Sequence, residues 1–169
     1  MALTKIQSLG ITDGTIVNAD INASAAIAGT KLSGAGKVLQ VVTATDSTQR
    51  TTTSTSFVTA SNTLSLSITP SSASNKIFLI ASLNGSSSAD YAGIFTVYRD
   101  ATNVAADNFM KTAATSSSRA SCTFSVLDSP SLTSAITYQI YLKSEGGSNS
   151  ARINIDTSTS TLTAFEIAG

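Results

Sequence analysis

Strict alternation of aliphatic and hydroxyl side chains is the feature that most limits how this chain can fold. The clearest run places Leu64, Leu66 and Ile68 among Ser65, Ser67 and Thr69, and Pro70 ends it. A period of two residues is that of a β-strand with one buried side and one side facing water, and proline cannot continue a central hydrogen-bond ladder. The run therefore predicts a half-buried strand.

Other segments repeat this pattern at short intervals, with polar residues between them. Further strands are predicted around residues 37–43, 77–80, 94–98, 122–126, 136–142, 153–155 and 162–167. Segment 77–80 is apolar on both faces, so we expect it at the centre of a sheet. Residues 84–93 and 144–150 predict loops, and residues 99–103 predict a hairpin turn. About nine short strands without helical windows indicate an all-β chain, and we predict an antiparallel, jelly-roll-like β-sandwich.

Composition removes several classes of function. About a third of the residues are Ser or Thr, whereas charged residues make up 12% of the chain and balance to zero. A disordered chain needs more charge, and a nucleic-acid-binding protein needs a basic surface. No stretch reaches the roughly 18 apolar residues of a membrane span, and the first residues lack the apolar core of a secretory signal. We therefore expect no nucleic-acid partner, no membrane insertion and no export by the usual signal.

The chain also lacks the usual residues of catalysis. It has no histidine, and its one cysteine, Cys122, lies on a predicted strand, where a buried thiol is expected. There is no Ser-x-x-Lys motif, and nothing in the spacing of Asp100 and Asp107, or of Glu145 and Asp156, brings two carboxyls into one cleft. We predict no catalytic residues, no cofactor and no metal site, and hence a protein that is not an enzyme.

The first 36 residues follow a different pattern. No aromatic residue precedes Phe57, and aliphatic side chains recur at steps of five or six, at Ile6, Ile11, Ile16, Ile21, Ile27 and Leu32. Neither helix nor strand has this period, and so few apolar groups cannot offset a backbone ordering cost of roughly 1–2 kcal/mol per residue. We expect residues 1–36 to be an extended segment that winds with sister chains or lies in a groove of another protein; a disordered leader is the alternative. Residues 37–169 would form the β-sandwich head.

Two parts of the sequence resemble known proteins. Residues 15–33, TIVNADINASAAIAGTKLS, resemble stretches that recur in tail-fibre and other virion proteins of marine bacteriophages, including those of cyanobacteria. The rest resembles the distal modules of such fibres through the motifs SFV (56–58), SITP (67–70), NKI (75–77), FTVYRD (95–100), LDSP (127–130) and FEIAG (165–169). These motifs cover most of the chain and are compositionally simple, and no catalytic residue carries over with them.

The resemblance implies a homotrimer that belongs to a virion and is made in the host cytoplasm. Residues 1–36 would then attach to a tail, adaptor or capsid protein, with the virion-docking or trimer contacts made by Ile6, Ile11, Ile16, Ile21, Ile27 and Leu32. The head would be exposed, and Tyr91 is a candidate contact to a host surface receptor. A short tail fibre or spike is the leading hypothesis, because the chain has almost no shaft.

Three other functions stay open. A capsid decoration or cement protein, or a head fibre, would use the same two parts and would differ in copy number per particle. A carbohydrate-binding receptor module would use the loops at 84–93 and 144–150. A polysaccharide depolymerase would need a site built between chains, and the low acid content argues against it.

Overall fold

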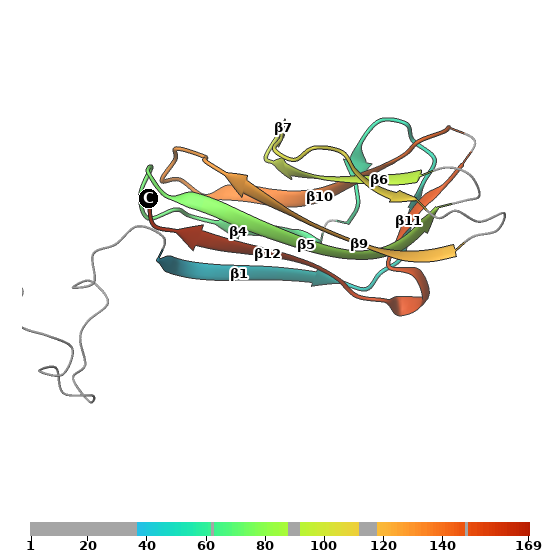
Figure 1. Cartoon of the computed structure of the whole chain (residues 1–169), viewed down its shortest axis with the longest axis horizontal. Helices are drawn as coiled ribbons and strands as arrows, with labels where there is room; N and C mark the ends of the chain where they lie inside the picture. Colours follow the sequence, from blue (N-terminus) through green and yellow to red (C-terminus); the bar gives the residue numbers. More distant parts are fainter. Residues whose placement is uncertain (1–36, 62, 88–91, 112–117, 148) are drawn as a thin grey trace, which may run out of the picture. The chain divides into compact units, whose positions relative to one another are not determined.

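Two antiparallel β-sheets, stacked face to face, make up the described part of the chain (Figure 1). The computed structural model describes residues 37–61, 63–87, 92–111, 118–147 and 149–169. The predicted β-sandwich is confirmed. The predicted attachment segment, residues 1–36, and Tyr91 lie outside the described residues.

The first sheet, called sheet A, is built around the long strand β5 (Lys76–Ser87). One side of β5 pairs with β9 (Ser118–Asp128), and the other side pairs with β12 (Ser160–Ile167) and then β11 (Ala151–Ile153). Outside these lie β1 (Val38–Asp46), paired with β12, and β2 (Arg50–Thr52), paired with β11. The expectation that segment 77–80 is central is confirmed.

The second sheet, called sheet B, is built around β6 (Ala92–Arg99) and β10 (Ile136–Ser144), which pair with each other. The free side of β10 pairs with β3 (Val58–Thr59) and β4 (Ser65–Ile68). The free side of β6 pairs with β7 (Thr102–Asn103) and β8 (Asn108–Lys111).

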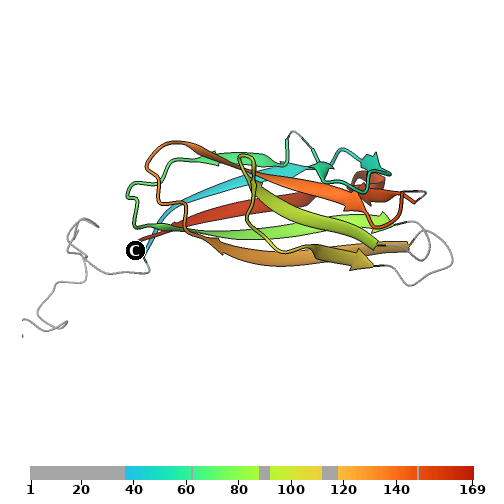
Figure 2. The ribbon, with the colours of Figure 1, turned by 90° about the horizontal axis from the view of Figure 1, so that it is seen from above.

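The strand order is that of a jelly roll. The chain crosses from one sheet to the other between β2 and β3, β4 and β5, β5 and β6, β8 and β9, β9 and β10, and β10 and β11. The order β1-β12-β5-β9 therefore faces the order β4-β10-β6-β8, which is the double Greek key of an eight-stranded jelly roll. In Figure 2 the strands of both sheets run along the same long axis, as expected for aligned sheet packing.

The core lies between the sheets and is formed by the inward residues of the alternating runs. Its largest fully buried members are Leu64, Ile68, Ile77, Leu79, Leu83, Phe95, Ile136, Tyr138, Ile140, Leu142 and Ile153. Full burial of one such aliphatic or aromatic side chain contributes about 1.5–3 kcal/mol. The alternation of the sequence thus decides which face of each strand meets the other sheet.

Two local predictions are wrong and one is confirmed. The predicted loop at 84–93 is mostly strand, because β5 continues to Ser87 and β6 begins at Ala92, and long pairing with β9 and β11 outweighs the turn tendency of these residues. The predicted strand at 153–155 ends at Ile153, and a 3-10 turn, η4 (Ile155–Thr157), follows. The hairpin at 99–103 is confirmed: Arg99 pairs with Thr102.

Candidate functional site

Three neighbouring rows of side chains on the outer face of sheet A are uncharged and partly apolar. They run across β1, β12, β5 and β9, following the strand register. The rows are Val41, Phe165, Phe78 and Leu127, then Thr43, Thr163, Ile80 and Ser125, then Thr45, Thr161, Ser82 and Thr123. None of these side chains carries a charge. These rows therefore lack the charged residues that normally keep a protein surface hydrated.

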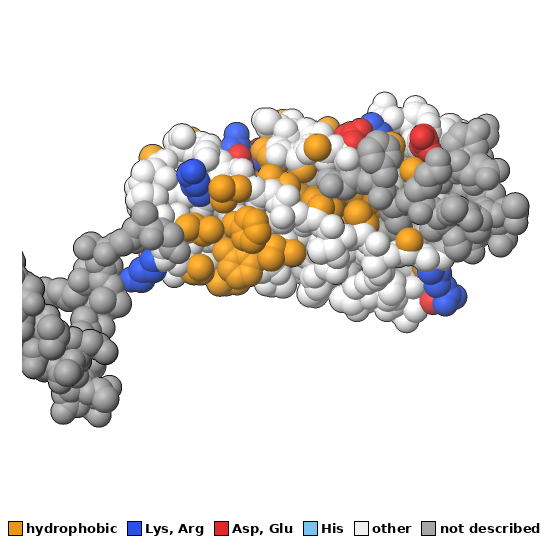
Figure 3. Space-filling model, viewed as in Figure 1, with side chains coloured by type: hydrophobic (Ala, Val, Ile, Leu, Met, Phe, Trp, Pro, Cys, Tyr) orange, Lys and Arg blue, Asp and Glu red, His pale blue; other side chains and the backbone are white. Residues whose placement is uncertain are grey.

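The first of these rows forms the centre of an exposed apolar patch. Val41 and Leu127 are 53% and 55% exposed, and between them the rings of Phe78 and Phe165 lie 6.3 Å apart by their centroids. Val38 and Leu39, at the start of β1, extend the apolar surface. Figure 3 shows hydrophobic side chains gathered on this face. A contiguous apolar patch on one face of a folded domain indicates an interaction surface.

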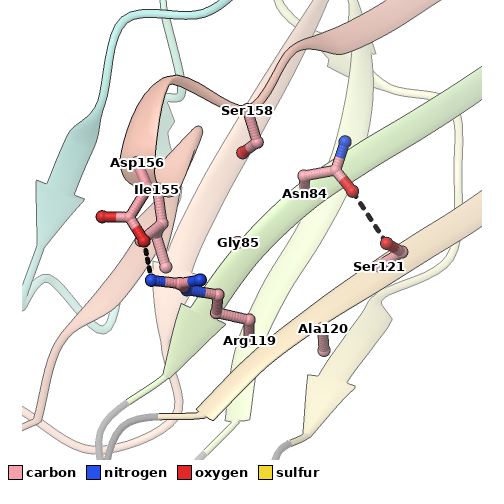
Figure 4. Close-up of a pocket in the computed structure, with 8 residues that line it drawn as sticks. All are labelled: Asn84, Gly85, Arg119, Ala120, Ser121, Ile155, Asp156 and Ser158. Atoms are coloured by element: carbon pink, nitrogen blue, oxygen red, sulfur yellow. Dashed lines mark hydrogen bonds and ion pairs between the residues drawn. The ribbon is translucent and has the colours of Figure 1, made fainter.

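A polar pocket of about 360 Å³ lies beyond the last row of this face (Figure 4). Its floor comes from β5 and β9, and its wall from η4 and the residue that follows it. The lining residues are Asn84, Gly85, Arg119, Ala120, Ser121, Ile155, Asp156 and Ser158. The pocket therefore joins three segments that are distant in sequence.

Polar contacts link the residues that line the pocket. Arg119 of β9 forms an ion pair with Asp156 of η4. Ser121 Oγ donates to Asn84 Oδ1 over 2.7 Å, and Asn84 Nδ2 donates to the carbonyl oxygen of Thr159 over 2.7 Å. The arrangement presents a guanidinium, a carboxylate and hydroxyl groups around one cavity (Figure 4).

Glu166 is a buried carboxylate near the end of β12, at the opposite end of the sandwich from the pocket. It is 1% exposed and follows Leu162 and Ala164 on the inward side of β12. Its carboxylate accepts hydrogen bonds from Asn75 Nδ2 and Gln40 Nε2, both over 2.6 Å, and from the N–H of Ser71, also over 2.6 Å. Burial by itself would raise the pKa of Glu166, but these hydrogen bonds outweigh it and hold the pKa below its usual value.

Asp46, at the end of β1, is the second buried carboxylate with a lowered pKa. Burial again acts to raise the pKa, and hydrogen bonds from the Ser61 hydroxyl and the Thr48 N–H lower it by more. Asp46 Oδ2 also accepts from Asn154 Nδ2 over 3.0 Å, which ties the end of β1 to the segment before η4. Both carboxylates thus join separate parts of the fold in their ionised form.

These two groups predict acid sensitivity. Because the folded-state pKa values of Asp46 and Glu166 lie below the unfolded values of 3.8 and 4.5, their stabilisation is present above pH 4.5 and is lost as pH falls through the folded values. Urea unfolding measured between pH 7 and pH 3 should show stability falling below about pH 4.5. The slope should be shallower in Glu166→Gln; an unchanged slope would contradict this assignment.

A third polar cluster lies between the sheets at the β9 end. Tyr138 Oη donates to Asp128 Oδ2 over 2.6 Å, and Arg99 Nη1 donates to both oxygens of the same carboxylate. Burial first, and then the hydrogen bond and charge of Asp128, raise the pKa of the Tyr138 phenol far above its usual range. The phenol therefore stays protonated at any physiological pH, and the cluster has a structural role.

The acidic residues named above as possible catalytic pairs each have a separate partner. Asp100 accepts from the N–H of Thr137, Asp107 forms an ion pair with Lys143, and Glu145 accepts from the N–H of Ala92. Asp156 lines the polar pocket. Cys122 faces the core from β9 and is half-buried, and burial raises the pKa of its thiol, which agrees with the role expected for it.

The sequence-predicted contact residues are not tested by this geometry. Ile6, Ile11, Ile16, Ile21, Ile27, Leu32 and Tyr91 all lie outside the described residues. The apolar patch could have been predicted from the sequence. Segment 77–80 is apolar on both faces, and only one face of a strand can point into a two-layer core. The pocket had none, since Arg119 and Asp156 meet only through the fold.

The described residues hold no cluster of metal-ligating side chains and no membrane-spanning helix. No group of three or more His, Cys, Asp or Glu residues in this part of the chain is placed to hold a metal ion. No helix among the residues described in the structure is long and apolar enough to cross a membrane.

This chain is distantly similar to chains of solved structures. No protein-family model and no curated protein sequence matches this chain. A chain in the solved structure of infectious bursal disease virus, Gx strain, matches 78% of this chain with a TM-score of 0.39 and 18% sequence identity. The match spans 39% of the length of that viral chain.

Proposed function

We propose that this chain is a structural subunit of a bacteriophage virion, in the form of a short trimeric fibre or spike. Residues 1–36 attach it to another virion protein, and residues 37–169 form an exposed head. The observation that carries the proposal is the three uncharged, partly apolar rows on the outer face of sheet A. A jelly roll buries its core between its own two sheets, so an additional apolar face calls for an additional partner.

A second copy of this chain is the partner that best fits the face. Uncharged rows on one copy meet the same rows on the next without burying an unpaired charge, which would cost several kcal/mol. In the trimer each head turns this face toward the axis and against its neighbours.

The size of the face limits the strength of this contact. Four strands about 4.8 Å apart, with alternate residues about 6.8 Å apart, give the three rows a flat area of roughly 400 Å². A stable complex buries about 800 Å² per partner. The heads alone should therefore associate weakly, and the full chain should form the stable trimer.

Light scattering on the full chain and on a chain lacking residues 1–34 tests this proposal. We expect three copies for the full chain, and a monomer–trimer equilibrium at higher concentration for the shortened chain, with circular dichroism showing that its β-sandwich is intact. A single-copy mass for both forms at every concentration would contradict the trimer. That result would favour a capsid decoration protein that assembles only on the particle.

The attachment role has a separate test in virus particles. Deleting residues 1–34 should prevent incorporation while leaving a folded head. Continued incorporation would rule out attachment through this segment. Copy number then decides between locations: a few dozen copies or fewer, in multiples of three, support a fibre, and hundreds support decoration of the capsid.

A further inference from the structure

The wall of the polar pocket belongs to an excursion, residues 154–160, which leaves sheet A between β11 and β12. On one side of β5, Ile153 pairs with Gly85 and Thr161 pairs with Ser82. Residues 154–160 therefore stand opposite only two residues of β5, Leu83 and Asn84, and most of them project over the outer face of sheet A. A direct connection between β11 and β12 would complete the strand without forming a pocket.

This excursion has a strained backbone. Asn154, Asp156 and Thr157 have φ values of 57°, 50° and 63°, in the left-handed region that favours glycine. Asn and Asp adopt this region more readily than most residues, whereas it is least favourable for a β-branched residue such as Thr157. Strain of this kind persists where the surroundings fix it, and it gathers at ligand-binding sites.

Hydrogen bonds fix the excursion at both of its ends. The N–H of Asn154 donates to the Asn84 carbonyl over 2.7 Å, and Asn154 Nδ2 donates to Asp46 Oδ2 and to the Thr48 carbonyl. At the other end, the N–H of Asn84 donates to Ser160 Oγ over 3.0 Å. The pocket is therefore preorganised, so a ligand would not have to order this wall when it binds.

The lining indicates the chemistry of the ligand. Arg119 and Asp156 balance each other in charge, so the pocket favours a neutral ligand over an anion or a cation. Their donors and acceptors stand beside the hydroxyls of Ser121 and Ser158, and Ile155 adds an apolar surface. Alternating hydroxyl and C–H groups are what a sugar ring offers to such a lining.

We propose that this pocket binds a neutral saccharide unit, as a single sugar or at the end of a glycan. Its volume of about 360 Å³ lies within the range of ligand pockets. It also lies about 27 Å along β5 from Lys76, where β1 begins, and beyond the three rows that meet the neighbouring copy in the proposed trimer. All eight lining residues come from one copy, so the proposal does not depend on the trimer.

Titration of the full chain with simple glycosides tests the proposal. The neutral probes are the methyl glycosides of glucose, galactose, mannose and N-acetylglucosamine, and the acidic probes are glucuronic acid and N-acetylneuraminic acid. Saturation-transfer NMR and calorimetry should show binding of at least one neutral glycoside. Arg119→Ala and Asp156→Asn should each weaken that binding at least tenfold, because each loses hydrogen bonds to a charged group.

The variants are chosen so that folding and binding separate. Asparagine tolerates the left-handed backbone at position 156, and Arg119 is largely exposed, so thermal unfolding should change little in either variant. Lys76→Ala, at the opposite end of β5, is the control and should bind as the unsubstituted chain does. Absence of binding to every neutral glycoside, binding that neither pocket variant weakens, or binding of the acidic sugars alone would overturn the proposal.

Discussion

Replacing Glu166 with alanine should lower the free energy of unfolding by about 3 kcal/mol, because it leaves one buried donor without its charged acceptor at about 2 kcal/mol and two partly exposed donors at about 0.5 kcal/mol each. The buried donor is the side-chain amide of Asn75, and the partly exposed donors are the N–H of Ser71 and the side-chain amide of Gln40. All three now bind the Glu166 carboxylate over 2.6 Å. Urea unfolding followed by circular dichroism measures the change, and the melting temperature should fall by about 9 °C.

Two further variants test whether the loss of stability is specific to the buried carboxylate of Glu166. Glu166→Gln keeps the shape but replaces one acceptor oxygen with a donor, so it should lose about half as much stability. Asp107→Ala removes an acid whose ion pair with Lys143 is partly exposed, and the expected loss is below about 1 kcal/mol. A loss of that small size for Glu166→Ala would contradict the role assigned to Glu166.

The sequence predicted strand positions well where one face is buried. Leu64 to Ile68 and Ile136 to Leu142 alternate because the second sheet covers every other residue, and the pattern is local enough to read without knowing the partner strand. Alternation also placed Glu166 on the same side as Leu162 and Ala164, so a buried carboxylate could have been expected from the spacing.

Other parts of the fold depend on contacts that no local pattern records. Residues 84–87 are Asn, Gly, Ser and Ser, which favour a turn, yet they continue β5 because β9 and β11 supply hydrogen bonds on both sides. The pocket combines residues of β5, β9 and η4, and its wall depends on positive φ values at Asp156 and Thr157. Neither residue type requires that conformation, so the sequence gives no signal for it.

Phe78→Lys should disrupt the proposed trimer at the centre of the outer face of sheet A. Phe78 lies between Phe165 and Leu127 in the most apolar row, so a lysine there would place an unpaired charge against the neighbouring copy. Burying this unpaired charge costs about 3 kcal/mol at each interface between two copies, which corresponds to roughly a hundredfold weaker association. Light scattering over a concentration series of the full chain should show a single-copy mass where the unsubstituted chain shows three copies.

A matched lysine on the opposite sheet separates the effect of this face from the effect of added charge. Ser67 is exposed on β4, so Ser67→Lys adds the same charge to the outer face of sheet B. The proposed trimer makes no contact through that face. We expect a three-copy mass for Ser67→Lys and a single-copy mass for Phe78→Lys, with both heads folded by circular dichroism. If both variants stay trimeric, sheet A does not face the axis, and assembly depends on residues 1–36; if both become monomeric, charge alone dissociates the trimer and the face has no special part in it.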